Sequence, residues 1–179
     1  MSNFVRTLNL IKTHRNMEWL TPSQRQALAA LKNVLRTSGT VNLCGPAGVG
    51  KTFLAWMMVD ELGYTYFPHL EYFARVERVT TLRVIIDNGQ SSRQSHRDAL
   101  KALQLQDVTH AVLITRRLIR DYTRYVKLAL LPQDIEKVQC NLASVGHLVH
   151  SAEISDLWSL VNPLVVGGLN AERITNYSG

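Results

Sequence analysis

The chain has 179 residues, of which 46% are hydrophobic and 19% charged, a balance that fits one globular domain with a small appendage. No apolar run approaches the roughly 20 residues of a transmembrane helix. Arg6 and Asn9 interrupt the N-terminus before an apolar signal segment forms, so we expect a cytoplasmic protein with no membrane partner. The two cysteines, Cys44 and Cys140, are too few for a disulfide framework.

The net charge of +6 is unevenly distributed. Residues 1–40 contain six basic side chains and one acidic, and residues 115–127 contain five basic and one acidic. Residues 151–179 contain three acidic side chains and one basic. A basic front of this kind could bind nucleic acid or an acidic protein. It could equally be a solvated surface together with the charges that a phosphate site needs.

Strands and helices are expected to alternate along most of the chain. Residues 1–20 form an N-terminal extension, and Thr21-Pro22 predicts the start of a helix that runs to about residue 37. Strands are then expected at residues 40–44, 64–67, 82–87, 109–115 and 125–131. Helices are expected at residues 51–62, 70–79, 92–105 and 133–148, with two short helices in residues 151–179.

These strands are nearly all apolar, which is typical of a parallel sheet covered on both faces. The sequence therefore predicts a three-layer α/β fold, with right-handed crossovers between strands. We expect residues 21–150 to form its main domain and residues 151–179 to form a small helical lid.

The motif "GPAGVGKT" matches the full phosphate-loop pattern G-x-x-x-x-G-K-[ST] and lies between an expected strand and an expected helix. In this pattern backbone N–H groups wrap the phosphates, and the helix N-terminus favours an anion. Lys51 would contact the β- and γ-phosphates, and Thr52 would bind Mg²⁺. The predicted nucleotide-binding residues here are Gly45, Pro46, Ala47, Gly48, Val49, Gly50, Lys51, Thr52 and Phe53.

Asp87 ends the apolar strand "VIID" about 35 residues after the loop. In a parallel sheet its carboxylate would lie near Thr52, where it could hold Mg²⁺ directly or through water. The alternative is that Asp87 caps the next turn. Asn88 follows where many nucleotide hydrolases have a glutamate; its amide could position a water but cannot usefully accept a proton. We therefore expect slow intrinsic hydrolysis, with Lys51, Asp87 and Asn88 as catalytic candidates.

The next strand, "VLIT", ends in Thr115, Arg116 and Arg117. The carboxyl edge of the sheet is where phosphates bind, so one of these arginines could contact a terminal phosphate. The alternative is two surface arginines at the start of a helix.

From about residue 20 to 170 the order of motifs resembles the STAND class of signal-transduction ATPases, which includes the NB-ARC and NACHT modules and is related to AAA+ proteins. The matching segments are "GPAGVGKT", "VIIDN", "ITRR", "YVKLALLPQDIEKV" and "LVNPLVVGGL". The resemblance implies a P-loop NTPase fold with ATP and Mg²⁺ as cofactors. It also implies a protein that acts as a switch.

Carried over residue by residue, the resemblance makes Arg117 the γ-phosphate sensor, with Thr115 as its strand-end partner. It places Pro163 of the lid near the nucleotide base. The chain departs from the family here, because Val161 stands where a glycine is expected two residues before the proline. An ordinary helix start is the alternative for Pro163.

A shorter stretch, "LTPSQRQAL", is similar to the Q motif of DNA helicases, in which a glutamine contacts the adenine edge. The matching residue is Gln24. Helicase cores need a second motor domain of similar size, so the resemblance implies only that Gln24 belongs to a base pocket.

Three functions remain open. The first is a weak ATPase that acts as a switch or assembly factor for protein partners or for copies of itself. The second is a nucleic-acid-dependent ATPase such as a loader or target selector, which the basic front favours. The third is a small-molecule kinase, for which "ITRRLIRDYTR" could serve as an arginine-rich lid, although no arginine follows Asp87.

Overall fold

The computed structural model describes residues 11–76, 79–87, 93–119, 122, 124–146 and 157. Two compact units are distinguished: Ser23–Ala129, and Met1–Pro22 together with Leu130–Gly179. Asn88, Pro163 and the expected lid of residues 151–179, apart from Leu157, lie outside the described residues. The described residues contain no helix long and apolar enough to cross a membrane.

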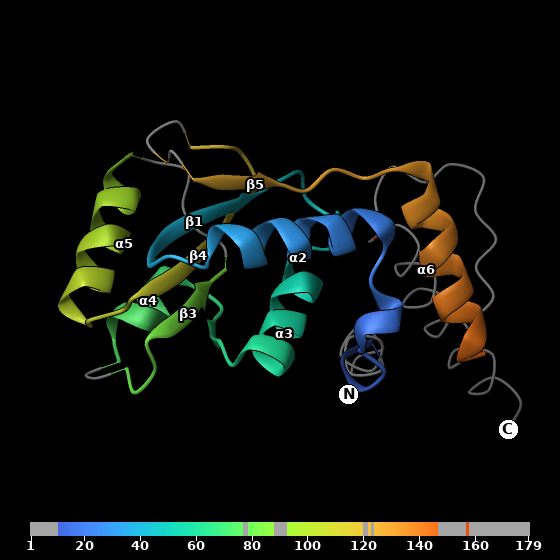
Figure 1. The fold of residues 1–179 in the computed structure, drawn as a ribbon, viewed down its shortest axis with the longest axis horizontal. Helices are drawn as coiled ribbons and strands as arrows, with labels where there is room; N and C mark the ends of the chain where they lie inside the picture. Colours follow the sequence, from blue (N-terminus) through green and yellow to red (C-terminus); the bar gives the residue numbers. More distant parts are fainter. Residues whose placement is uncertain are drawn as a thin grey trace, which may run out of the picture. The chain divides into compact units, whose positions relative to one another are not determined.

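The first unit is built on a five-stranded sheet in the order β2-β3-β4-β1-β5 (Figure 1). Every neighbouring pair of strands is parallel, so the prediction of a parallel α/β sheet is confirmed. The central strand β4 has β1 on one side and β3 on the other, which brings the carboxyl ends of these three strands together. The strands are β1 (Gly39–Cys44), β2 (Thr65–Phe67), β3 (Arg83–Ile86), β4 (His110–Thr115) and β5 (Tyr125–Lys127).

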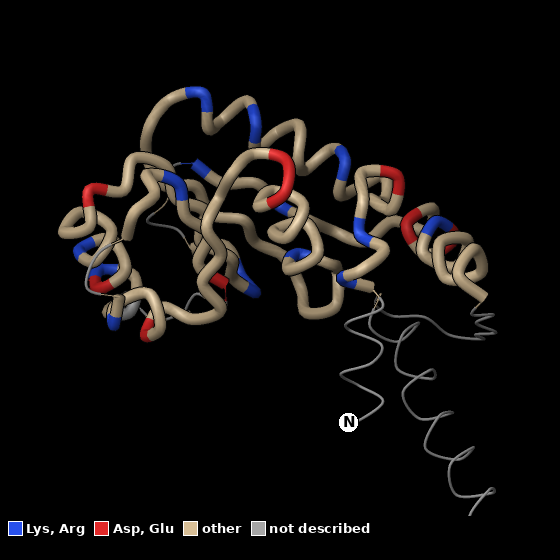
Figure 2. The backbone as a smooth tube through the Cα atoms, turned by 90° about the horizontal axis from the view of Figure 1, so that it is seen from below, with Lys and Arg blue, Asp and Glu red and all other residues tan. Residues whose placement is uncertain are grey.

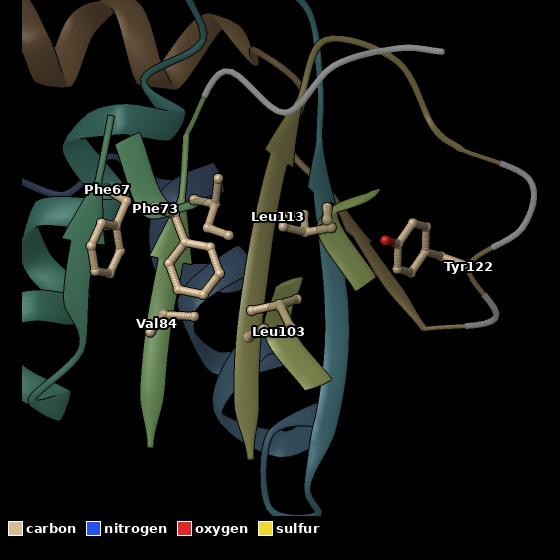
Figure 3. Close-up of a cluster of buried hydrophobic side chains, with 9 residues drawn as sticks. Phe67, Phe73, Val84, Leu103, Leu113 and Tyr122 are labelled. Atoms are coloured by element: carbon tan, nitrogen blue, oxygen red, sulfur yellow. The ribbon is translucent and has the colours of Figure 1, made fainter. Parts of the chain in front are cut away.

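Helices connect the strands and cover both faces of the sheet. The helices of this unit are α2 (Pro22–Val34), α3 (Lys51–Leu62), α4 (Leu70–Ala74) and α5 (Arg93–Leu105). In Figure 3 the labelled side chains lie on one side of the strands with α5 beside them, and α2 lies behind the strands. The three-layer arrangement follows from strands whose successive side chains are buried on opposite faces, as at Val84, Ile85 and Ile86.

One face of the sheet carries a continuous apolar cluster, which we call the α5-face core. Phe73 of α4 is fully buried there and meets Phe67 of β2 edge to face, with ring centroids 5.0 Å apart. Ala99 and Leu103 of α5 are four residues apart, so both lie on the face of the helix that packs against this cluster. The buried members are Phe67, Phe73, Val84, Ile86, Ala99, Leu103, Ala111, Leu113 and Tyr122.

Two elements are shorter than the sequence predicts. The expected strand 125–131 ends at Lys127, because the chain leaves the sheet after Leu128 donates its N–H to the Cys44 carbonyl. The expected helix 70–79 ends at Ala74. There the Gln106 side chain donates to the Val76 carbonyl and accepts from the Val79 N–H, at 2.9 and 3.1 Å, and these two bonds hold the backbone out of the helix.

Helix α2 also ends early, at Val34. The Arg124 guanidinium donates to the carbonyls of Val34, Thr37 and Ser38. Val34 is the last residue of the helix, where carbonyls lack an intrahelical partner and a cation is favourable, and Thr37 and Ser38 lie in the turn that follows. Arg124 therefore fixes the turn that leads from α2 into β1.

In the second unit, α6 (Pro132–Ser144) starts with a proline in its first turn. The Asp134 carboxylate accepts the Leu131 N–H at 2.7 Å and so caps the helix. The Asn141 side chain donates to the carbonyl of Trp19 at 2.9 Å and ties α6 to the short helix η1 (Met17–Trp19). Leu142 and Leu157 are the buried residues of a small apolar cluster in this unit.

Candidate nucleotide-binding site

The phosphate loop connects β1 to α3 and depends on glycine at two positions. A Cβ at Gly45 would collide with the carbonyl oxygen of Leu128, so only glycine lets the loop start beside the chain that leaves β5. Gly50 has a φ of 84°, a left-handed backbone conformation that residues with a Cβ rarely adopt. Both requirements come from backbone geometry, which explains the glycines at these ends of the motif.

Helix α3 begins directly after the loop, and its N-cap residue Gly50 makes no side-chain capping hydrogen bond. The first backbone N–H groups of a helix have no intrahelical acceptor, and the helix dipole makes this end favourable for anions. The start of α3 therefore has the backbone chemistry of a phosphate site.

The Lys51 ammonium lies over the loop, where it donates to the carbonyls of Gly45, at 2.7 Å, and Pro46. Burial lowers the pKa of Lys51 below its usual value of 10.5, Asp87 works in the opposite direction, and the positive charge of Arg116 lowers it further. The fold thus holds a cation in a partly desolvated place next to another cation. An anion bound in the loop would offset both the burial of the Lys51 charge and its repulsion by Arg116.

Asp87 follows β3 and accepts hydrogen bonds from two hydroxyl groups at the same oxygen. Thr52 of α3 donates to its Oδ2 at 2.7 Å, and Tyr66 of β2 donates to it at 2.8 Å. Tyr66 pairs with Ile85 in the sheet, so it lies on the same face as Asp87. The predicted proximity of Thr52 and Asp87 is thus present in the structure.

The Thr52 and Asp87 oxygens fit a magnesium site. Mg²⁺ prefers oxygen ligands and is commonly held by one or two protein groups, with water and phosphate completing the octahedron. Within the described residues no group of three or more His, Cys, Asp and Glu side chains could hold a metal ion. With Thr52 and Asp87 as its protein ligands, a magnesium ion would take its remaining ligands from water and phosphate.

Tyr66 is a hydrogen-bond donor that the sequence did not indicate. Burial raises its pKa, and the charge of Asp87 and the hydrogen bond to it raise the pKa further. The phenol therefore stays protonated and keeps donating to the carboxylate. A tyrosine one position before the end of an expected strand was the only signal available.

The end of β4 places Thr115 beside Cys44, its partner in the sheet register, and the Gly45 N–H donates to the Thr115 carbonyl at 3.3 Å. Thr115 is buried, and its hydroxyl donates to the carbonyl of Arg117 at 2.7 Å. Arg116 and Arg117 are exposed. This strand end lies next to the first residue of the phosphate loop.

Gln24 of α2 contacts the phosphate loop at Gly50. Its side chain is 2% exposed, and its Nε2 donates to the Gly50 carbonyl at 3.2 Å. This bond ties α2 to the last residue before α3. The adenine-edge role of Gln24 stays a prediction.

Comparisons with known proteins point to the fold. No family model and no curated protein matches the chain. Among solved structures, a DNA replication initiation factor is 11% identical, with a TM-score of 0.50. AMPPCP-bound DnaA from Aquifex aeolicus is 12% identical, with a TM-score of 0.45. Each match covers 87% of this chain and 61% of the other chain.

The chain has a three-layer α/β fold of the P-loop NTPase kind, built on a parallel five-stranded sheet. At these identities the likeness concerns the fold alone. The STAND class is not distinguished from other proteins of this fold by these matches.

Within this P-loop fold, most of the predicted site residues lie at one end of the sheet. The loop residues 45–52, Phe53 in the first turn of α3, Asp87 and Thr115 all lie at or directly after the carboxyl ends of β1, β3 and β4. Arg117 follows Thr115 there. Sequence reasoning missed Tyr66 and the buried Asn42 of β1, whose only signal was a polar residue inside an apolar strand.

Proposed function

We propose that this chain is an ATP-binding P-loop NTPase that hydrolyses slowly and acts as a switch or assembly factor for protein partners or for copies of itself. The hydrogen bond between Thr52 and Asp87, at 2.7 Å, supports the proposal most directly. It joins the phosphate loop's helix to the strand-end carboxylate that the magnesium hypothesis requires. Assignment to the STAND class rests on the order of motifs in the sequence.

In this proposal the loop's N–H groups and the start of α3 bind the phosphates, and Lys51 moves its ammonium from the Gly45 and Pro46 carbonyls to the β- and γ-phosphate oxygens. Bound Mg²⁺ would neutralise charge on those oxygens. Thr52 and Asp87 would hold the metal. Tyr66 would keep the Asp87 carboxylate oriented. Pro163 and Gln24 remain candidates for the base pocket.

The test of the switch hypothesis is the mass of the protein in solution with and without a non-hydrolysable ATP analogue and Mg²⁺. We expect nucleotide to change the assembly state of the wild type. Lys51→Ala removes the phosphate contact and should abolish both binding and the change in mass. Binding that survives in Lys51→Ala would contradict the site, and an unchanged mass with tight binding would contradict the switch.

Slow hydrolysis follows from Asn88, which cannot act as a general base. A missing general base typically costs about 10²–10⁴ in rate. We expect Asn88→Glu to raise steady-state turnover or leave it unchanged, without weakening nucleotide binding. Wild-type turnover at tens per second would show that another residue supplies the base.

A nucleic-acid-dependent ATPase is the second candidate, and the outer face of α2 favours it. Arg25 and Lys32 are exposed and stand at i and i+7, so they align along about 10 Å of one helix face, and the exposed Arg36 follows in the turn after the helix. Helix α2 contains no acidic residue. Figure 2 shows the Lys and Arg positions following this helix. A solved structure of similar fold is that of a DNA replication initiation factor.

This candidate is tested by the salt dependence of duplex DNA binding. Each phosphate contact contributes about 0.9 to the slope of log affinity against log salt. Replacing Arg25 and Lys32 with glutamine should therefore lower the slope by about 2. The matched control replaces Arg97 and Lys101, two exposed basic residues of α5. An equal effect of both sets would show that only net charge matters.

A further inference from the structure

Asn42 is a fully buried polar residue inside β1, an interior strand of the sheet between β4 and β5. Its Nδ2 donates to the Leu113 carbonyl at 3.0 Å and to the Thr115 hydroxyl at 2.9 Å. Its Oδ1 accepts the Ile119 N–H at 3.4 Å. Both polar groups of the Asn42 amide therefore form hydrogen bonds with β4 or with the segment that follows it.

The orientation of this amide is fixed by its partners. Turned over, it would place its carbonyl oxygen against the Leu113 carbonyl and its NH₂ group against the Ile119 N–H, so both contacts would be repulsive. A buried amide with two good donor bonds specifies its surroundings more sharply than an apolar side chain of the same size. Asn42 thus ties the end of β4 to the strand that leads into the phosphate loop.

The ties shape the turn formed by residues 115–119. The Thr115 hydroxyl accepts a hydrogen bond from Asn42 and donates one to the Arg117 carbonyl at 2.7 Å. Ile119, bonded to Asn42 through its N–H, packs against the α5-face core together with the buried Tyr122. The backbone at 117 and 119 is therefore drawn over that face of the sheet.

In the sequence Arg116 stands between two of these anchored residues, Thr115 and Arg117. The Thr115 carbonyl accepts the Gly45 N–H, so Arg116 follows directly the residue that touches the start of the phosphate loop. Thr115 shares the α5 face with Asn42 and Leu113 and is the last residue of β4. If the alternation of the strand continues by one residue, the Arg116 side chain is directed toward the opposite face. That face holds Asp87 and its partner Thr52. The positive charge of Arg116 lowers the pKa of Lys51 in the phosphate loop.

We propose that Asn42 is a positioning residue that, through Thr115, holds the turn 115–119 so that Arg116, rather than Arg117, faces the terminal phosphate of the bound nucleotide. The inference rests on the proposed function. It reassigns the phosphate-sensing role to the neighbouring arginine and adds a buried side chain that sets which arginine is presented.

The test compares affinities for ADP and for a non-hydrolysable ATP analogue, both with Mg²⁺. Wild type should prefer the triphosphate. A hydrogen bond to a charged group contributes enough that Arg116→Ala should lower this preference about tenfold or more, while Arg117→Ala lowers it far less. Asn42→Leu should lower the preference too, with little change in ADP affinity, because only the contact to the last phosphate is misplaced.

Two further comparisons separate positioning from packing. Thr115→Ser keeps the hydroxyl and should keep the preference, whereas Thr115→Val should lose it; this pair decides if Asn42→Leu does not fold. Adding Asn42→Leu to Arg116→Ala should cause no further loss of preference, because both changes remove one interaction.

The proposal is overturned if Arg117→Ala loses the preference and Arg116→Ala keeps it. It is also overturned if Asn42→Leu and Thr115→Val weaken ADP and the triphosphate analogue equally, or if wild type shows no preference. Wild type that binds neither nucleotide, like Lys51→Ala, would overturn the proposed function and this inference with it.

Discussion

Lys51 carries a positive charge that the fold makes costly, because burial and the nearby Arg116 lower its pKa. A group with a lowered pKa begins to lose its proton at a pH below its usual value of 10.5. A bound phosphate favours the charged form. Nucleotide binding should therefore take up a proton as the pH approaches the pKa of the free protein.

From this we predict that ATP affinity falls as the pH rises from 7 toward 10, with an uptake of protons that grows over the same range. Calorimetry in buffers of different ionisation enthalpy measures the uptake directly. Lys51→Arg keeps a permanent charge and should flatten the dependence, although its bulkier head weakens binding. Proton release over this range would contradict the assignment of Lys51 to the phosphates.

Tyr66 provides the second prediction at this scale. Its hydroxyl is bonded to the 5%-exposed Asp87, and hydrogen bonds to charged groups contribute about 1.5–3 kcal/mol. Tyr66→Phe should lower the free energy of unfolding by about that amount in denaturant titrations. It should also raise the Mg²⁺ concentration needed for half-maximal ATP binding. An unchanged Mg²⁺ requirement would show that Tyr66 does not orient the carboxylate.

At the scale of elements, burial of the α5-face core stabilises the sheet against α4 and α5. Phe73 is fully buried between α4 and the strands. Phe73→Ala should cost about 3–5 kcal/mol of unfolding free energy, because it removes a large buried ring and leaves a cavity. The neighbouring Tyr72 is 59% exposed, and Tyr72→Ala should cost about 1 kcal/mol or less. Equal losses of unfolding free energy in the two variants would show that Phe73 is not part of the core.

Most of these elements could be predicted from the sequence because their signals are local. The apolar strand "VLIT", the glycines of the phosphate loop and the proline at the start of α6 depend on the residues around them. The early end of α4 could not be predicted, because it is imposed by Gln106, 30 positions after Val76. The short β5 likewise reflects where the chain must leave the sheet.

The candidate site divides in the same way. Lys51, Thr52 and Asp87 form recognisable motifs, since a phosphate loop and a strand-end carboxylate have fixed spacing. The contacts of Tyr66 and Asn42 are tertiary, with their partners 21 positions or more away in sequence. Which of Arg116 and Arg117 reaches the loop depends on the turn that Asn42 holds, and no local pattern contains that information.

At the scale of the whole molecule, the candidate residues of the phosphate loop, Asp87 and Thr115 all belong to the unit Ser23–Ala129. A ligand that binds only the folded state stabilises it by an amount set by its concentration relative to the dissociation constant. Nucleotide should therefore stabilise this unit first, whatever its effect on the remainder of the chain.

We predict that an ATP analogue with Mg²⁺ at 100 times its dissociation constant stabilises the unit Ser23–Ala129 by about 2.7 kcal/mol. Native-state hydrogen exchange resolves the effect by segment, and increased protection is expected in residues 39–62 and 83–87 and in β4. Lys51→Ala should remove the protection at the same ligand concentration. Protection confined to residues 130–146 would place the nucleotide outside the phosphate loop, because none of the loop's hydrogen-bond donors lies in that segment.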